Sequence, residues 1–146
     1  GRALDKKQST RLLFPNGYEP EKDRAYRTVE SVFSQTAKAA GYHFPSLESM
    51  SFPQVQPDDI GEIMRLLELQ GKALYLSADI CTLPSLADKA VEKIREILEE
   101  EGRIAITRVC GLLDTSRKNA RLMLDYTDRM GITRKDKAES ERVKAI

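Results

Sequence analysis

The chain has 146 residues, 32% of them charged, and the charges nearly balance to a net charge of +1. This length is enough for one or two small domains with a buried core. We expect neither a membrane span nor secretion, because no apolar run reaches the roughly 18 residues of a spanning helix and the start of the chain lacks the apolar segment of a signal peptide.

The first half of the chain predicts two helices and a β-ribbon. Residues 1–19 have no helical period, and the apolar residues 12–14 before a Pro-Asn-Gly turn indicate a short strand or a docked arm. After this arm, proline at a first helical position and glycine at a helix end set the boundaries. The expected elements are a helix from Pro20 to a stop at Gly41, a loop with one helical turn at 46–50, a helix from Pro57 to a stop at Gly71, and a ribbon over 72–83.

The second half predicts the same plan again. Ser85, with Asp88 three residues later, resembles a capping box at the start of a helix that ends at Gly102. Thr107 is expected to cap a short helix. The expected elements are a helix over 85–101, a strand over 103–106, a short helix over 107–113, a long helix from Thr115 to a stop at Gly131, and a final β-ribbon.

The helix stops recur at a constant spacing. Gly41 and Gly102 are 61 residues apart, and Gly71 and Gly131 are 60 apart. A plan of helix, short helix, third helix and two-stranded ribbon, given twice, predicts a mainly α fold with small β-ribbons, built as tandem winged-helix (helix-turn-helix) domains. Two unrelated helical hairpins are the alternative.

The repeat divides the chain into two predicted domains, residues 1–83 with the N-terminal arm and residues 84–146. The net charge also differs between the two ends of the chain. Residues 102–146 hold 11 Lys and Arg against 6 Asp and Glu, a net charge of +5, whereas residues 1–101 hold 13 against 17, a net charge of −4. We therefore expect the C-terminal third to meet an anionic partner and the rest of the chain to face something different.

The helix that begins after Thr115 carries the clearest functional signal. Thr115 and Ser116 are good N-cap residues, and Arg117 and Lys118 follow in the first turn. A helix N-terminus is already positive, so basic side chains there suit a surface that meets an anion. An apolar stripe and a polar, mostly basic face are typical of a recognition helix, with a solvated surface helix as the alternative. The stripe is Ala120, Met123, Leu124, Thr127 and Met130, and the opposite face is Lys118, Arg121, Asp125 and Arg129.

Cysteine and histidine are too few and too scattered for a metal site. Cys81 and Cys110 lack CxxC spacing, and His43 is the only histidine, so we expect no zinc and no cofactor. Two free, buried thiols are typical of a reducing cytoplasm, and a disulfide between them is the less expected alternative. No catalytic triad can be assembled around one histidine, so we expect no enzyme activity in this chain.

The segment over 112–135, with TSRK at 115–118 and then Ala120, Leu124, Tyr126, Gly131 and Thr133-Arg134, resembles the last winged helix of a bacterial selenocysteine-specific elongation factor. The resemblance covers residues 87–135, about a third of the chain. It implies a translational GTPase that delivers selenocysteinyl-tRNA and whose C-terminal winged helices bind a hairpin in selenoprotein mRNA just after the recoded UGA codon. This chain has no GTPase motif, so it would be the mRNA-binding fragment, with the ribosome as a further partner.

Three features depart from the family pattern. Asp114 stands where a small residue is usual, Lys135 where the pattern has arginine, and the loop over 136–141 is longer and partly acidic.

Because the major groove of A-form RNA is too narrow for a helix, the helix tip and the wing are expected to grip phosphates at a hairpin end. The candidate RNA-binding residues are Arg117, Lys118 and Arg121 first, then Arg134 and Lys135 of the wing, Arg103 and Arg108 beside it, and Thr115, Ser116 and Asn119 as hydrogen-bonding groups.

Two other functions fit the same sequence. Winged helices often read duplex DNA as transcriptional regulators, but no dimerisation helix follows the two domains, and we expect a monomer. The acidic first domain also fits a protein-interaction module. On the RNA-binding hypothesis, residues 85–146 alone are expected to retain binding.

Overall fold

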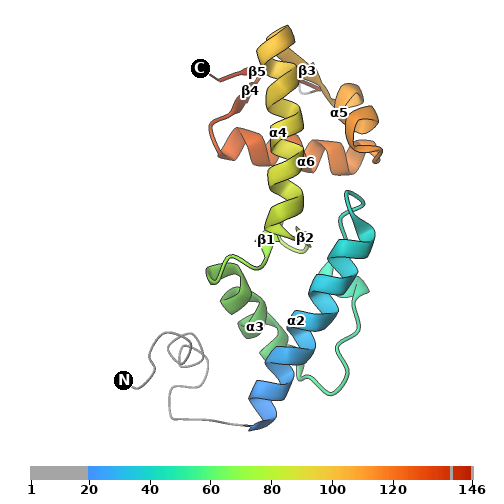
Figure 1. Cartoon of the computed structure of the whole chain (residues 1–146), viewed down its shortest axis with the longest axis vertical. Coiled ribbons are helices and arrows are strands. Elements are labelled where there is room, and N and C mark those ends of the chain that lie inside the picture. Colours follow the sequence, from blue (N-terminus) through green and yellow to red (C-terminus); the bar gives the residue numbers. More distant parts are fainter. Residues whose placement is uncertain (1–19, 139, 146) are drawn as a thin grey trace.

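The computed structural model describes residues 20–138 and 140–145, with the backbone alone for residues 20–22. The arm expected within residues 1–19 lies outside these residues. Two helical units stack end to end in an elongated molecule (Figure 1). In chain order the elements are α2 (Pro20–Ala40), the 3-10 helix η1 (Leu47–Ser49), α3 (Pro57–Leu69), β1 (Leu74–Tyr75), β2 (Cys81–Thr82), α4 (Pro84–Glu101), β3 (Arg103–Ala105), α5 (Ile106–Leu113), α6 (Arg117–Arg129), β4 (Thr133–Lys135) and β5 (Glu141–Lys144).

The first unit packs α2 against α3 and closes with a short ribbon. Its core includes Val29, Phe33 and Ala37 of α2 and Ile63, Met64 and Leu67 of α3, all buried. Strands β1 and β2 pair antiparallel, and an isolated bridge between Ser46 and Ile80 adds a second, shorter pairing. The two predicted helix stops, Gly41 after α2 and Gly71 after α3, are confirmed. Both glycines have positive φ, a conformation that costs glycine little.

The second unit is a three-helix cluster with a wing. Helices α4, α5 and α6 bury one core, which includes Ile94, Val109, Met123 and Leu124. The wing is a three-stranded antiparallel sheet in the order β3-β5-β4. A mainly helical chain with small antiparallel sheets, in two units of the same plan, is the tandem winged-helix fold that the sequence predicts.

The predicted N-cap of α4, Ser85, is wrong by two residues. The helix begins at Pro84, and its N-cap is Leu83, whose side chain cannot accept a hydrogen bond. Ser85 and Asp88 therefore lie inside the helix and form no capping box. Proline favours the first helical position, because its missing N–H group would have no partner there in any case.

The predicted cap of α5 is also wrong. The helix begins at Ile106 with Ala105 as its N-cap, so Thr107 lies within the helix and the preceding strand ends one residue earlier than expected. The N–H of Ile106 donates to the carbonyl oxygen of Ser140 at 2.8 Å. A backbone group of the wing thus satisfies a helix end that the sequence assigned to a side chain.

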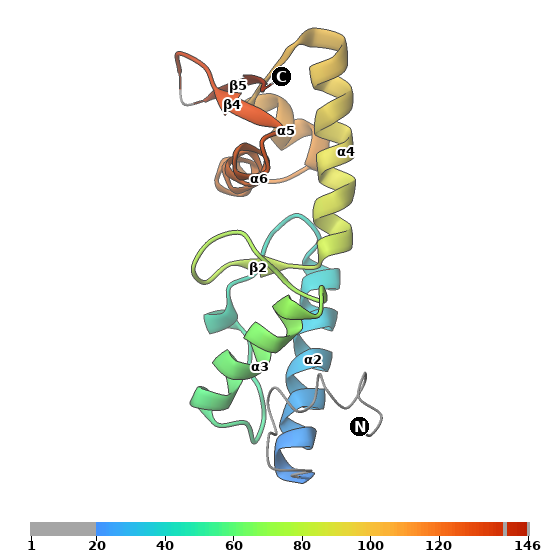
Figure 2. The same cartoon turned by 90° about the vertical axis from the view of Figure 1, so that its left-hand side faces the viewer.

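One apolar cluster joins the two units. Phe44 and Leu76 belong to the first unit, yet they are only 7% and 2% exposed and pack in the core formed by α4, α5 and α6. The β1–β2 ribbon lies directly beneath α6 in Figure 2. The domain boundary between residues 83 and 84 stays a prediction, and apolar packing continues across it.

Candidate nucleic-acid interface

Helix α6 begins with a side-chain N-cap. The Oγ atom of Ser116 accepts the backbone N–H of Asn119 at 3.3 Å and the Asn119 side-chain amide at 3.1 Å. Ser116 is the N-cap, as predicted. Arg117 and Lys118 are therefore the first two helical residues, where unsatisfied N–H groups and the helix dipole already favour an anion.

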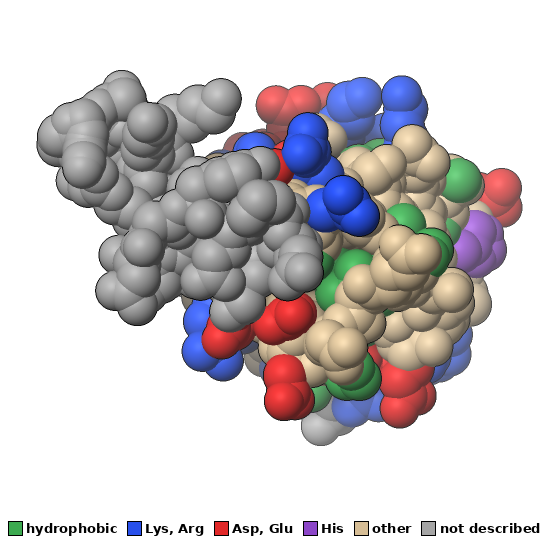
Figure 3. Space-filling model, turned by 90° about the horizontal axis from the view of Figure 1, so that it is seen from below, with side chains coloured by type: hydrophobic (Ala, Val, Ile, Leu, Met, Phe, Trp, Pro, Cys, Tyr) green, Lys and Arg blue, Asp and Glu red, His purple; other side chains and the backbone are tan. Residues whose placement is uncertain are grey.

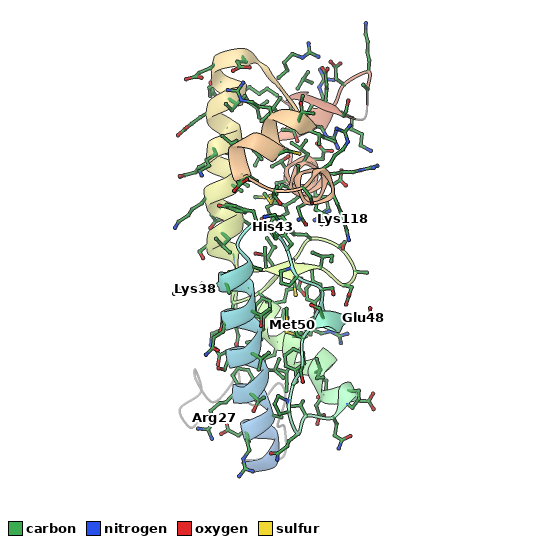
Figure 4. The ribbon with its side chains drawn as sticks, turned by 90° about the vertical axis from the view of Figure 1, so that its right-hand side faces the viewer. Arg27, Lys38, His43, Glu48, Met50 and Lys118 are labelled. Carbon is green, nitrogen blue, oxygen red and sulfur yellow. The ribbon has the colours of Figure 1, made fainter. Side chains whose placement is uncertain are left out.

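A cleft of about 480 Å³ lies beside this helix start. Three cations of α6 line it together with apolar and polar groups of α5 and the wing, and one carboxylate. Arg117 and Lys118 are exposed and make no ion pair with any residue that the structure describes. Figure 4 shows Lys118 on the side of the molecule away from α4. The lining residues are Ile106, Arg117, Lys118, Arg121, Leu122, Asp125 and Ser140.

The two wing candidates occupy opposite faces of the sheet. Arg134 pairs with Val143, and Lys135 pairs with Arg142. Cross-strand partners share a face and successive residues alternate, so Lys135 lies on the same face as Arg142, which packs on α6. Arg134 lies on the outer face, in one row with Arg103. Lys135 therefore lies on the face of the sheet that packs on α6 and Arg134 lies on the other face, and neither residue lines the cleft.

The two flanking candidates already face carboxylates. Arg103 forms ion pairs with Asp136 and Glu141, and Arg108 lies 3.3 Å from Glu101. Neither arginine lines the cleft. Their positive charge is partly compensated, so they attract a phosphate less strongly than Arg117 and Lys118 do.

Thr115 does not cap the helix. Its hydroxyl donates to the carbonyl oxygen of Tyr42 in the first unit at 2.6 Å. Of the three hydrogen-bonding candidates, Thr115 is engaged with the first unit, and Ser116 and Asn119 are engaged with each other.

The turn before Thr115 explains one departure from the family pattern. Asp114 ends α5 with φ of 52°, in the left-handed region that favours glycine. Aspartate tolerates this region better than most residues do. The left-handed backbone at residue 114 therefore accounts for an aspartate there, although its exposed carboxylate lies close in sequence to the basic helix tip.

A buried arginine that the sequence patterns did not indicate ties the wing to α6. The side chain of Arg142 is fully buried and donates to Asp128 at 2.9 Å and Asp125 at 3.0 Å. Asp128 also accepts the hydroxyl of Thr133 at 2.6 Å. Two carboxylates three residues apart on a mainly basic helix were the available signal, because such a pair calls for a cation between them.

The last turn of α6 also differs from the predicted pattern. Met130, expected in the apolar stripe, is 52% exposed. Arg129, expected on the basic face, lies over the ring of Tyr126 at 5.7 Å and donates to the carbonyl oxygen of Leu76 at 3.4 Å. Burial raises the pKa of Tyr126. This end of the helix contacts the first unit, and the cleft lies beside the earlier residues 117–125 of α6.

The first unit has the opposite charge at its equivalent helix. Helix α3 has Asp58 and Asp59 in its first turn, where α6 has Arg117 and Lys118. Figure 3, which views the end of the first unit, shows basic and acidic side chains interspersed around exposed apolar ones. Carboxylates at a helix start disfavour a phosphate there.

The described residues offer neither a cluster of metal ligands nor a membrane-spanning helix. No group of three or more His, Cys, Asp or Glu side chains there could hold a metal ion. None of the helices in this part of the chain has the length and apolar character needed to cross a membrane. Both cysteines are free, as expected. Cys81 is buried as expected, whereas Cys110 is partly exposed.

Comparison with known proteins identifies the fold. No family model and no curated protein matches the sequence. The structure of the mRNA-binding domain of elongation factor SelB from E. coli, in complex with SECIS RNA, matches with a TM-score of 0.69 and 18% identity over 87% of this chain and 98% of that chain. This chain has the SelB mRNA-binding-domain fold. A bacterial selenocysteine-specific elongation factor, EF-Sec, matches with a TM-score of 0.58 and 15% identity over 87% of this chain and 20% of that chain.

The SelB likeness confirms the resemblance drawn from residues 112–135 and extends it across both units. The chain spans about a fifth of the EF-Sec chain. At these identities the likeness describes how the chain folds, and the chemistry of the cleft depends on its own residues.

Proposed function

We propose that this chain binds an RNA hairpin through the cleft beside α6, as the mRNA-binding part of a cytoplasmic selenocysteine-specific elongation factor. In this role it recruits selenocysteinyl-tRNA delivery to a UGA codon upstream of the hairpin, next to the ribosome. The chain acts by binding and not by catalysis. The observation that carries the proposal is the gathering of Arg117, Lys118 and Arg121 on one wall of the cleft, at the positive end of α6. The SelB-like fold supports it.

RNA is a better ligand for this helix start than duplex DNA. Reading several DNA base pairs depends on arginine, asparagine and glutamine side chains aimed at base edges. The only amide side chain in the first turn of α6 is that of Asn119, and it is hydrogen-bonded to Ser116. Cations at a helix tip are suited to phosphates at the end of a compact hairpin, where one or two unstacked bases are also accessible.

A binding comparison tests the proposal directly. Hairpins are selected with this chain from an RNA pool with a randomised loop and one bulged base, and affinities are measured by fluorescence anisotropy. We expect opening the loop or deleting the bulge to weaken binding far more than swapping stem pairs that preserve pairing. Duplex DNA of matching sequence should bind at the nonspecific level, roughly micromolar or weaker at physiological salt.

Linear RNA of the same composition serves as the control for charge alone. A DNA duplex that competes as well as the best hairpin would replace the elongation-factor role with that of a DNA-binding regulator. Binding of all these nucleic acids with equal affinity would reduce the cleft to a nonspecific cationic surface.

A further inference from the structure

The residue just before the recognition helix is held by the first unit. Thr115 precedes the N-cap Ser116, and its hydroxyl donates to the main-chain carbonyl of Tyr42 at 2.6 Å. The two residues are 73 positions apart in the chain. The first unit therefore contacts the chain at Thr115, two residues before α6 begins at Arg117. Arg117 is the first cation of the cleft.

Tyr42 is itself fixed between the two units. Its phenolic hydroxyl donates to the carbonyl oxygen of Leu86 in α4 at 3.2 Å. Its ring meets the buried ring of Phe44 edge to face, with centroids 6.1 Å apart. Burial raises the pKa of Tyr42, so its hydroxyl stays protonated and able to donate across the neutral range. The carbonyl that accepts the Thr115 hydroxyl thus belongs to a residue held by two contacts, its hydrogen bond to Leu86 and its ring packing on Phe44.

The other end of α6 also rests on the first unit. Arg129 donates to the carbonyl oxygen of Leu76, which is buried beneath α6. Figures 1 and 2 show α6 lying across the top of the first unit, over the loop after α2 and the β1–β2 ribbon. Contacts at both ends fix the direction of the helix more tightly than either contact alone.

We propose that Tyr42, acting through Thr115, is a positioning residue that sets the orientation of α6, so that the first unit tunes RNA binding without touching the RNA. This inference rests on the proposed function. Binding groups require placement to within about 0.5 Å, which depends on the residues that support them. Thr115 is then a support for Arg117 and Lys118, and not itself a ligand of the RNA. The acidic start of α3, with Asp58 and Asp59, agrees with a first unit that stays off the phosphates.

The test is a double-mutant cycle on the full chain, with the best selected hairpin as probe. Thr115→Val and Tyr42→Phe each remove one hydroxyl and keep the shape. Each should weaken hairpin binding about three- to tenfold, in line with the loss of one hydrogen bond. The salt dependence should stay unchanged, because no phosphate contact is lost. Both variants loosen the same support. The double variant should therefore bind the hairpin no more weakly than the single variant that has the lower affinity.

Matched variants separate positioning from other effects. Thr115→Ser keeps the hydroxyl and should bind as the parent does. Thr107→Val removes an exposed threonine hydroxyl, and Tyr26→Phe removes a hydrogen bond to Gln70 within the first unit, so both should leave affinity unchanged. Thermal melting shows that each variant is folded at the assay temperature.

The outcomes that overturn the inference are distinct. If Thr115→Val weakens binding and Tyr42→Phe does not, or if their effects add, the threonine hydroxyl acts at the RNA directly. If the parent chain binds no hairpin, the proposed function fails on its own. Hydrogen exchange then decides the positioning role: both variants should speed exchange of the amides at residues 119–123, and unchanged exchange overturns it.

Discussion

The Nε atom of Arg142 lies 2.9 Å from a carboxylate oxygen of Asp128, and no part of the arginine side chain is exposed. The same guanidinium donates to Asp125 at 3.0 Å, so β5 is joined to α6 through two carboxylates on neighbouring turns. A buried cation of this kind stabilises only while its partners are present, because removing one leaves the others uncompensated. The pairing fixes the wing beside the cleft.

Arg142→Ala should therefore lower the free energy of unfolding by about 3–5 kcal/mol. The reason is that Asp125 and Asp128 would face each other without their cation. Urea denaturation followed by circular dichroism measures the change. Arg103→Ala removes an exposed arginine from the same sheet and should cost about 1 kcal/mol or less. Equal effects of the two substitutions would contradict the structural role given to Arg142.

Salt dependence measures how many phosphates the cleft neutralises. For about three to five phosphates, log affinity should fall against log salt with a slope of roughly −2 to −4. Arg117→Ala and Lys118→Ala should each flatten that slope by about 0.7–0.9. Lys93→Ala, an exposed lysine on α4, is the matched control and should leave it unchanged. A parent chain whose affinity ignores salt would rule out a phosphate grip.

Phe44 should stabilise the unit that follows it in the chain. Phe44→Ala is expected to cost about 3–5 kcal/mol, as for other buried phenylalanines, and to loosen the packing under α6. The chain has no tryptophan, so its near-ultraviolet circular dichroism reports mainly on tyrosine packing. This signal and hydrogen exchange of α6 measure the effect. If exchange changes only within α2 and α3, Phe44 supports the first unit alone.

The same packing revises an expectation about truncation. The sequence predicts that residues 85–146 alone retain RNA binding. Removing the first unit exposes the surface that Phe44 and Leu76 cover, and burial of each such side chain is worth about 1.5–3 kcal/mol. We now expect the isolated second unit to bind the hairpin more than tenfold more weakly than the full chain. Anisotropy with both proteins checks this, and affinities within tenfold would restore the first expectation.

Alkaline pH should destabilise the first unit. Burial raises the pKa of Cys81 to about 12 and that of Tyr75 to about 12. The negative charge of Cys81 adds to the shift of Tyr75, and nearby carboxylates add to both. Above the ordinary values of 9.0 and 10.0 the unfolded chain loses these protons while the folded chain keeps them. Stability therefore falls as pH rises from about 9 to 12.

Urea midpoints at pH 7, 9 and 10.5 test this direction. Cys81→Ala and Tyr75→Phe remove the two groups and should each reduce the loss of stability on going from pH 7 to 10.5. Comparison with the parent cancels the titration of other groups. A parent chain that gains stability over this range would contradict the assigned burial.

Local signals predicted most of the helices and the grouping of three cations at the candidate site. Gly41, Gly71, Gly102 and Gly131 mark helix ends because each adopts a positive φ. Arg117, Lys118 and Arg121 come together because Arg121 follows Arg117 by four residues and Lys118 by three, and residues at these spacings share a helix face. The errors at Ser85 and Thr107 have a local cause as well: a proline and a backbone carbonyl of the wing made side-chain caps unnecessary.

Long-range pairings could not be read from the same patterns. Nothing near Thr115 indicates that its hydroxyl meets Tyr42, and nothing near Arg142 shows which of the neighbouring carboxylates it joins. Strand alternation places Arg134 and Lys135 on opposite faces, but only the pairing register shows that Lys135 shares the face of Arg142. Such relations depend on how elements pack, and single-sequence periodicity does not carry that information.

The shared apolar cluster has a consequence for how the chain is made. Synthesis is vectorial, so Phe44 and Leu76 emerge from the ribosome before the residues that cover them, which begin with α4. At about 5–20 residues per second, the wait for α6 lasts several seconds. During that interval the nascent first unit presents an uncovered apolar surface, which favours contact with chaperones or with a neighbouring nascent chain on the same message.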